Sequence, residues 1–177
     1  MSPEAATGQA VPVFRKARPE DGAKMYELVR EMGGLELNTA YFYVLFCIDF
    51  ADTCVVAEVD GEMAGFVLGH RPPKRPDTVF VWQVGVAPWM RKQGLARRLL
   101  EAFLEQNPDA RWLEASVTPS NKPSRKLFRS VARDHGVGCN VDTFMLAEHF
   151  PDGHEPEELF RIGPFESNSN PKQVSKS

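Results

Sequence analysis

A short basic turn with a glycine at its centre is the part of the sequence best suited to binding an anion. Residues 91–96 read Arg-Lys-Gln-Gly-Leu-Ala, and no acidic residue stands between Gln83 and Arg98. The apolar spacing that follows is helical, and the first amides of a helix lack intrahelical partners and carry a partial positive charge. Gly94 and Ala96 leave a ligand room to reach those amides. The pattern predicts a phosphate site, with a solvated basic face or a close-packed turn as the alternatives.

Histidine and cysteine give weaker signals. His70 lies at the end of a predicted strand and could act as a base, although a hydrogen-bonded structural histidine is the commoner case. Cys139 would be a nucleophile only in an acyl-enzyme route, and no recognisable base precedes it. The three cysteines, Cys47, Cys54 and Cys139, match no metal-ligand spacing. We therefore expect free thiols, no resident metal and a reducing compartment.

A buried strand and an amphipathic helix must hold the basic turn. Residues 79–86 are β-branched and aromatic, which is typical of a buried strand. Leu95, Leu99 and Phe103 fall on one face of a helix. The strand therefore delivers the chain to the turn, and the turn opens the helix.

The remaining elements are expected from apolar spacing and turn residues. Asp60-Gly61 predicts a hairpin. The other elements are a strand at 13–17, a helix from Pro19 to Gly33, a helix after Asn38-Thr39, strands at 53–59, 63–70, 112–117 and 140–146, and a helix from Asn121 to about Gly136. Residues 147–165 are expected to be irregular and to pack back through Leu159, Phe160 and Ile162. This order predicts an α/β fold in which one mixed sheet is flanked by helices on both faces. Ligands of such sheets lie beyond the carboxyl ends of diverging strands.

Charge is distributed unevenly along the chain. The 177 residues have a net charge of −3, but residues 91–133 carry ten Lys and Arg against four Asp and Glu. Because this segment contains the basic turn, the distribution favours a small polyanion over a solvated face. A nucleic-acid-binding domain is more often basic overall, so we expect no nucleic acid as partner.

Length and composition are those of an ordinary domain, with 42% hydrophobic and 25% charged residues. We expect a single domain at 12–165, a disordered arm at 1–11 and a disordered tail at 166–177. The N-terminus lacks the apolar core of a secretory signal, and the longest apolar run, 40–48, is too short to span a bilayer. We therefore expect a cytoplasmic protein with no membrane partner.

Two motifs together resemble the GNAT superfamily of N-acetyltransferases over roughly residues 13–146. They are Arg91-x-x-Gly94-x-Ala96 after one strand and Asn121-x-x-Ser124-x-x-Leu127-Phe128 after the next. The resemblance implies the GNAT fold, with a mixed, mostly antiparallel central sheet flanked by helices, and acetyl-CoA as cosubstrate. It places the pyrophosphate on the amides of 93–96 and the pantetheine arm along the backbone of 84–86. The implied cofactor-binding residues are Val84, Gly85, Val86, Arg91, Lys92, Gln93, Gly94, Leu95, Ala96, Asn121, Ser124 and Phe128.

Four further stretches are similar to the diaminobutyrate acetyltransferases of ectoine biosynthesis, which acetylate the 4-amino group of L-2,4-diaminobutyrate. The stretches are 35–41, 50–57, 80–84 and 154–159. This substrate carries cationic amines, so its pocket should offer acidic and aromatic groups. The implied substrate-binding residues are Glu36, Tyr41, Trp82 and Glu157. Glu36 stands where the family resemblance leads us to expect an aspartate, and Glu158 is the alternative to Glu157.

The reaction that the resemblance implies is direct attack of a neutral amine on the thioester, with Tyr41 and Glu36 as catalytic candidates. Many family members protonate the departing thiolate with a tyrosine in the helix of the second motif, and the matching position here is Phe128. Tyr41 is the first candidate for this acid, although it could equally be a packing aromatic. The general base is left open.

Two other functions fit the same residues. One is an N-acetyltransferase for another small amine, such as a polyamine or an aminoglycoside, and the other is a catalytically silent acetyl-CoA-binding module. A homodimer is the expectation from the family. The apolar run at 41–46 could serve either a subunit interface or the core.

Overall fold

The computed structural model describes residues 11–151 and 153–166. The arm predicted over 1–11 and the tail predicted over 166–177 lie, except for Val11 and Glu166, outside the described residues. The described part forms one seven-stranded sheet in the order β1-β2-β3-β4-β5-β7-β6. The strands are β1 Val13–Lys16, β2 Cys54–Val59, β3 Glu62–His70, β4 Thr78–Val86, β5 Trp112–Val117, β6 Gly138–Met145 and β7 Glu157–Gly163.

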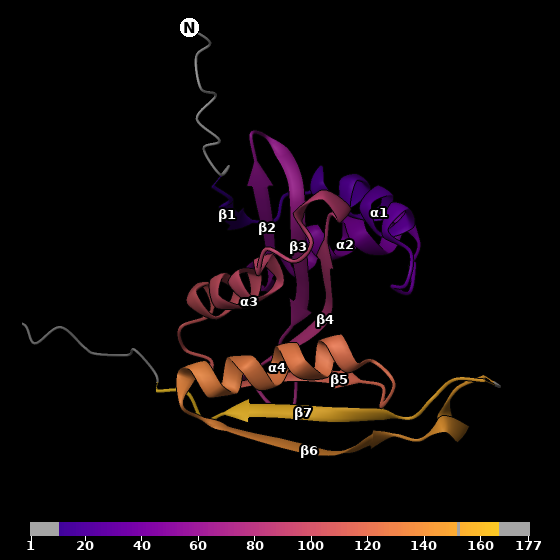
Figure 1. Ribbon diagram of the computed structural model, residues 1–177, viewed down its shortest axis with the longest axis vertical. Coiled ribbons are helices and arrows are strands. Elements are labelled where there is room, and N and C mark those ends of the chain that lie inside the picture. The colour runs from indigo at the N-terminus through magenta and orange to yellow at the C-terminus, as the bar shows by residue number, and fades with distance from the viewer. Residues whose placement is uncertain (1–10, 152, 167–177) are drawn as a thin grey trace, which may run out of the picture.

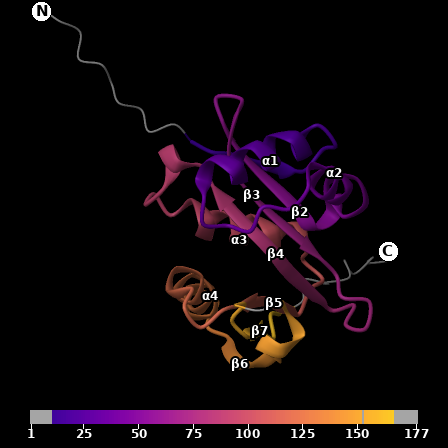
Figure 2. The same ribbon diagram turned by 90° about the vertical axis from the view of Figure 1, so that its right-hand side faces the viewer.

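Four α-helices cover the described sheet on its two faces. They are α1 Asp21–Met32, α2 Ala40–Asp49, α3 Leu95–Gln106 and α4 Lys122–His135. Figures 1 and 2 show α1 and α2 beside β3 and β4, α3 across the same strands, and α4 along β5 and β7. Two apolar cores result, because α1 and α2 pack on one face through Met25, Tyr43 and Phe46, and α3 and α4 pack on the other through residues such as Leu99 and Phe128.

Local sequence explains the ends of these helices. The Thr39 side chain accepts a hydrogen bond from the Phe42 amide at 3.2 Å and so caps α2, as Asn38-Thr39 predicts. Gly136 ends α4 with a φ of 62°, which an L side chain rarely adopts. The longest helix, α4, has 14 residues. Over residues 11–151 and 153–166, no helix has both the length and the apolarity of a bilayer span.

The sheet is antiparallel except at one seam. All neighbouring strands pair antiparallel apart from β4 and β5, which run parallel. The turn between β2 and β3 holds Asp60 at φ 52° and Gly61 at φ 80°, as an Asp-Gly hairpin requires. The predicted mixed, mostly antiparallel sheet is therefore confirmed, and the predicted strands and helices are found with small differences at their ends.

Strand β7 is the element that the sequence prediction missed. Residues 147–165 were expected to be irregular, but Glu157–Gly163 is a strand that lies between β5 and β6. It opens with Glu157-Glu158, a residue type that is depleted in strands, and it carries a further charge at Arg161. Ion pairs offset this, because Glu158 pairs with Arg125 of α4 and Arg161 pairs with Glu114 of β5. The strand depends on partners far away in the sequence.

Strand β4 contains a β-bulge at Trp82. Leu68 of β3 pairs with Gln83 and the next residue, Gly69, pairs with Val81, so Trp82 is an extra residue in β4. A bulge bends its strand and increases the local twist. Trp82 and Gln83 both face α2 as a consequence: the Trp82 ring lies 6.0 Å from that of Phe46, and Gln83 bonds to Tyr43.

The parallel seam ends at the bulge. Pairing between β4 and β5 runs only from Thr78 opposite Trp112 to Val81 opposite Ala115. Beyond it, β4 continues to Val86 and β5 to Val117 without pairing to each other. The two strands diverge, and the sheet is open between them.

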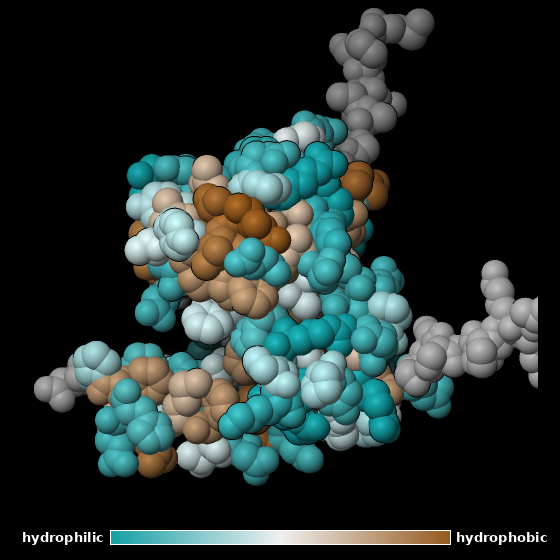
Figure 3. Space-filling view, turned by 180° about the vertical axis from the view of Figure 1, so that it is seen from behind, coloured by the Kyte–Doolittle hydropathy of each residue, from teal (hydrophilic) through white to brown (hydrophobic). Residues whose placement is uncertain are grey.

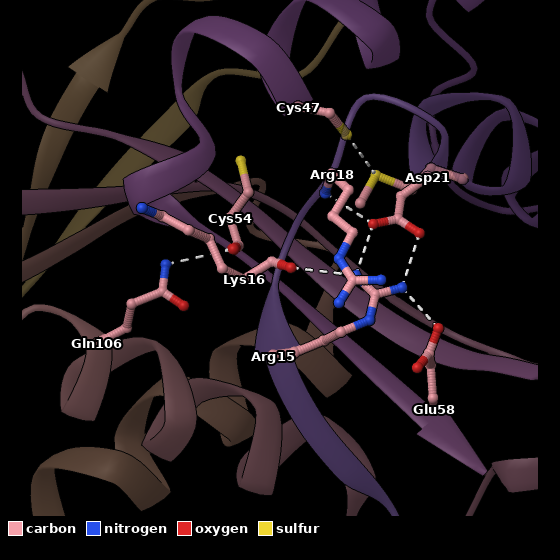
Figure 4. Close-up of polar contacts among 9 residues, drawn as sticks. Arg15, Lys16, Arg18, Asp21, Cys47, Cys54, Glu58 and Gln106 are labelled. Atoms are coloured by element: carbon pink, nitrogen blue, oxygen red, sulfur yellow. Dashed lines mark hydrogen bonds and ion pairs between the residues drawn. The ribbon is translucent and has the colours of Figure 1, made fainter. Parts of the chain in front are cut away.

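Buried carboxylates tie the elements together in two places. Asp21 at the start of α1 is fully buried and accepts hydrogen bonds from both terminal nitrogens of Arg15 and from the Arg18 amide; Arg15 also pairs with Glu58 (Figure 4). Glu114 of β5 is also fully buried, and it pairs with Arg75 at 2.8 Å and with Arg161. Each buried charge is thus matched by arginine, which is the usual condition for burying a carboxylate.

Candidate functional site

The divergence of β4 and β5 opens a cleft of about 220 Å³. It is lined by both strands, by the first turns of α4, by the start of β7 and by the loop between α1 and α2. The predicted residues that line it are Glu36, Trp82, Val84, Asn121, Ser124, Phe128 and Glu157. Larger hollows of about 700 and 630 Å³ lie beside the carboxyl ends of α3 and α4 and beside the β2–β3 hairpin, away from these residues.

The edge of β4 that faces the cleft carries the predicted donor-side backbone. Past Val81 this edge has no pairing with β5, so an extended ligand can bind to it as an added strand. An amide on such an edge can also donate to an oxygen that gains negative charge. Gly85 belongs here because a Cβ at this position would lie 2.5 Å from the Phe66 ring. Of the predicted Val84, Gly85 and Val86, Val84 lines the cleft directly.

The predicted anion site lies at the amino end of α3, and residues 91–96 do not line the cleft. Gly94 is the N-cap residue, with a φ of 73° and no side-chain cap. The first backbone hydrogen bond of α3 runs from the Arg98 amide to the Gly94 carbonyl at 3.2 Å. The amides of residues 95–97 therefore have no intrahelical acceptor. A Cβ at Gly94 would meet nothing within 4 Å. The helix end is therefore open to a phosphate.

Side chains of the turn hold it against the rest of the molecule. Arg91 donates to the carbonyl of Met32 at the end of α1 over 3.2 Å, and Gln93 donates to the Trp89 carbonyl over 3.1 Å. Lys92 has a φ of 59°, so the turn contains a second residue in the left-handed region. These contacts fix the direction from which α3 begins.

The start of α4 supplies the opposite wall of the cleft. Asn121 accepts the Ser124 amide through Oδ1 at 3.2 Å and so caps the helix. Its Nδ2 donates to no group of the described residues and is available to a ligand. Phe128 is buried, with its ring 6.2 Å from that of Phe160, and offers no hydroxyl to a departing thiolate.

Two carboxylates meet at the acceptor end of the cleft. Glu36 comes from the α1–α2 loop and Glu157 from the first residue of β7. The pKa of Glu157 is raised, mainly because burial disfavours its charge; the hydroxyl of Ser116 and the charge of His154 act in the opposite direction, and the charge of Glu36 raises it further. The site offers negative charge to a cation at this end.

Trp82 and Tyr41 have different positions relative to the cleft. Trp82 is 51% exposed and lines the cleft, with its ring 5.7 Å from Phe42 and 6.2 Å from His70. Tyr41 is 74% exposed on the first turn of α2 and does not line the cleft. Its predicted catalytic role therefore has no support from contacts within the described chain and stays a prediction.

Sequence reasoning missed two residues that shape this end of the cleft. Gln83 is buried and accepts from the hydroxyl of Tyr43 at 3.1 Å while donating to the carbonyl of Glu36 at 2.9 Å. A glutamine inside a strongly apolar strand was the available signal, because a buried amide requires partners. Tyr43 gave no such signal, since it lies in an aromatic run.

The expected hydrogen bond of His70 is not found at its Nδ1, which is buried without a partner in the described structure. Aromatic packing against Phe80 and Trp82 holds the ring instead. Burial lowers its pKa, which favours the neutral imidazole. Burial raises the pKa of Cys139, so this thiol is a poor nucleophile.

Comparison with known proteins assigns the chain to a family. Residues 22–132 match the model of the acetyltransferase (GNAT) family. The chain belongs to the GNAT family of acetyltransferases. The predicted resemblance is thereby confirmed, and the cleft at the diverging strands of this acetyltransferase is its candidate active site.

Individual relatives are more specific. The acetyltransferase is 47% identical over 156 residues to L-2,4-diaminobutyric acid acetyltransferase of Marinococcus halophilus, which covers 86% of this chain and 90% of the relative. It is 42% identical over 166 residues to the enzyme of the same name from Oceanobacillus iheyensis, covering 91% and 93%. A solved structure of the diaminobutyrate acetyltransferase EctA from Paenibacillus lautus, in complex with L-2,4-diaminobutyric acid and coenzyme A, is similar with a TM-score of 0.84 and 40% identity, covering 91% of this chain and 99% of that one.

Proposed function

We propose that this acetyltransferase moves the acetyl group of acetyl-CoA to the 4-amino group of L-2,4-diaminobutyrate, giving N4-acetyl-2,4-diaminobutyrate for ectoine biosynthesis. The observation that carries the proposal is the cleft at the end of the β4–β5 seam. It has an open strand edge and the start of α4 on the donor side, and two carboxylates on the acceptor side. The named relatives support the same substrate pair.

The donor side fits coenzyme A. The amides of residues 95–97 suit its pyrophosphate, with Arg91 and Lys92 adding positive charge nearby. The pantetheine arm is flexible and rich in amides, so it can pair with the free edge at Val84–Val86 as a strand would. The thioester is then held in the gap, with a β4 amide placed to stabilise the tetrahedral oxyanion.

The acceptor side must bind a cationic ammonium group and then remove its proton, because only the neutral amine is a nucleophile. An alkylammonium has a pKa near 10, so the neutral form costs about 4 kcal/mol at pH 7. Glu36 and Glu157 attract the ammonium groups, and Trp82 adds an aromatic wall. Glu157, with its raised pKa, is the group best suited to take the proton, directly or through water.

The transfer itself requires no covalent enzyme intermediate. The amine nitrogen attacks the thioester carbon, the C–S bond breaks, and the coenzyme A thiolate leaves. Phe128 cannot protonate that thiolate, and the exposed Tyr41 lies outside the cleft. Because a thiolate is a tolerable leaving group, solvent can supply the proton.

Acceptor profiling tests the proposal. We expect thiol release from acetyl-CoA with L-2,4-diaminobutyrate and a product acetylated at N4 by NMR. Preference for spermidine or an aminoglycoside would overturn the substrate assignment. Binding of coenzyme A without any thiol release would indicate a silent binding module instead.

We also infer a homodimer formed through α2. This helix is apolar all round, and Figure 3 shows an apolar patch over it; Ile48 is 55% exposed there. A surface helix of this kind usually covers a partner. Light scattering should give twice 19.8 kDa for the native chain and a lower mass for Ile48→Lys. The control Val13→Lys, at an exposed position of edge strand β1, should keep the native mass; a monomeric native chain would refute the dimer.

We propose the cytoplasm as the location. The support is chemical, because Cys47, Cys54 and Cys139 are all free thiols, as a reducing compartment favours.

A further inference from the structure

Gln83 joins the donor side of the cleft to its acceptor side. It follows the bulge at Trp82 and therefore turns toward α2. Its side-chain amide is engaged at both ends, since Oε1 accepts from Tyr43 and Nε2 donates to the Glu36 carbonyl. Tyr43 is fully buried and Gln83 is 7% exposed, so neither group can exchange its partner for bulk water without movement.

Besides Leu35, which packs against the apolar core under α1 and α2, the loop that carries Glu36 has few other anchors. It connects α1 to α2 and begins with Gly33 at φ 58° and Gly34 at φ 81°, a backbone that adopts many conformations when it is not held. Within the described residues, the bond from Gln83 is the only side-chain hydrogen bond to residues 33–38. The amide of Gln83 thus determines where Glu36 sits opposite Glu157.

We propose that Gln83 is a positioning residue for the amine acceptor, and that its hydrogen bond to the Glu36 carbonyl holds the acceptor loop in register with the bulged strand that faces the thioester. The inference rests on the proposed function and deepens it. One bulge thereby sets two features, because it frees the β4 edge for the donor and turns Gln83 toward the loop that receives the acceptor.

Kinetics of Gln83→Met provide the test, because methionine keeps the length and removes both hydrogen bonds. We expect KM for L-2,4-diaminobutyrate to rise about tenfold, and KM for acetyl-CoA to stay within about twofold. Tyr43→Phe is the matched control, since it removes only the inner bond and leaves Gln83 bound to Glu36. It should change both constants less than about twofold.

A double-mutant cycle separates positioning from general damage. Glu36→Ala should raise KM for diaminobutyrate in the native chain and have little further effect in Gln83→Met, because the loop is already displaced. Equal increases in both KM values, or an unchanged Glu36→Ala effect in the Gln83→Met background, would overturn the proposal. If Gln83→Met fails to fold, Tyr43→Phe/Gln83→Met replaces it, because removing both buried partners leaves no orphaned hydroxyl.

A measurement without substrate keeps this inference distinct from the proposed function. Backbone order parameters of residues 34–38 should fall from the rigid range near 0.85 to below about 0.6 in Gln83→Met and stay high in Tyr43→Phe. Unchanged order parameters would refute the anchoring role even if the native chain acetylates diaminobutyrate. Native turnover that fails while the loop loosens would instead refute only the substrate.

Discussion

Glu157 experiences opposing demands, because a site for a cation needs its charge and its surroundings disfavour that charge. Burial and the nearby Glu36 raise its pKa. The folded chain therefore binds more protons than the unfolded chain between the ordinary value of 4.5 and the raised value. Stability contributed by Glu157 falls as pH rises through this window.

Glu157→Gln is accordingly expected to be more stable than the native chain at about pH 8, with the difference closing toward the ordinary pKa of a glutamate. Thermal unfolding at several pH values measures this. The same variant should show a higher KM for diaminobutyrate and lack the acidic decline of kcat/KM that protonation of Glu157 causes. A stability difference between Glu157→Gln and the native chain that does not change with pH would show that titration of Glu157 is not its cause.

At this scale the sequence identified side chains better than it identified their neighbours. Glu36, Trp82 and Glu157 were predicted and all line one cleft, because charge and aromatic character follow from residue type. Gln83 was missed because its role depends on a bulge, and nothing local in the sequence marks where β4 gains its extra residue. Tyr41 was preferred over Tyr43, since an aromatic run does not reveal which hydroxyl is buried.

Among the elements, α3 depends on its first residue in a way that can be isolated. Gly94 and Gly136 have similar φ values, 73° and 62°, and a Cβ at either would meet nothing within 4 Å. Alanine at either position therefore carries similar backbone strain, about 1 kcal/mol. The two differ in location, because Gly94 begins α3 at the predicted phosphate site and Gly136 ends α4.

Gly94→Ala should raise KM for acetyl-CoA several-fold, because the strained turn shifts the amides that hold the pyrophosphate. Gly94→Ala and Gly136→Ala should lower the melting temperature by similar amounts, but Gly136→Ala should leave the KM for acetyl-CoA unchanged. Initial-rate kinetics and thermal unfolding of both variants provide the check. An equal KM effect from the two variants would show that general strain, not the anion site, is responsible.

The buried Asp21 joins β1, α1 and β2 (Figure 4). Burial alone would raise its pKa, but the hydrogen bonds from Arg15 and from the Arg18 amide lower it below the ordinary 3.8. The stabilisation is present above that value and is lost as pH falls through the lowered pKa.

Asp21→Asn should destabilise the chain at neutral pH by on the order of 3 kcal/mol, because it leaves Arg15 short of a partner. The difference in stability from the native chain should narrow as pH falls from the ordinary 3.8 to the lowered pKa of Asp21, because over this range the unfolded carboxylate is protonated and the folded one is not. Urea unfolding across this pH range measures the gap. A gap that persists at low pH would indicate that shape, not charge, is responsible.

Elements were predictable where the pattern is local. The hairpin at Asp60-Gly61 and the cap at Thr39 follow from residues next to each other in the chain. Strand β7 was not predictable in this way, because Glu158 and Arg161 are stabilised by Arg125 and Glu114 across the sheet. Its insertion between β5 and β6 is a long-range fact of topology.

For the whole molecule, the short seam between β4 and β5 joins two halves of the sheet. Four residue pairs make the parallel ladder, and Figure 1 shows β1–β4 above it and β5–β7 with α4 below it. A ligand that contacts the start of α3, the edge of β4 and the start of α4 would connect both halves.

Coenzyme A at a hundred times its Kd should raise the free energy of unfolding by about 2.7 kcal/mol. Hydrogen exchange should slow in both halves of the sheet, at the β4 edge and at the first turn of α4. Differential scanning calorimetry and exchange mass spectrometry measure the two effects. Protection from exchange that is confined to one half of the sheet would contradict the bridging position of the ligand.

The gap in the sheet also has a consequence for the order of events. Its walls come from both faces, with the α1–α2 loop on one and α4 on the other, so we expect donor and acceptor to enter from opposite faces without obstructing each other. Both substrates must be bound in the cleft at the same time before the acetyl group can be transferred. Initial-rate plots should therefore intersect rather than run parallel, and acetyl-CoA alone should release no free thiol in a single-turnover burst.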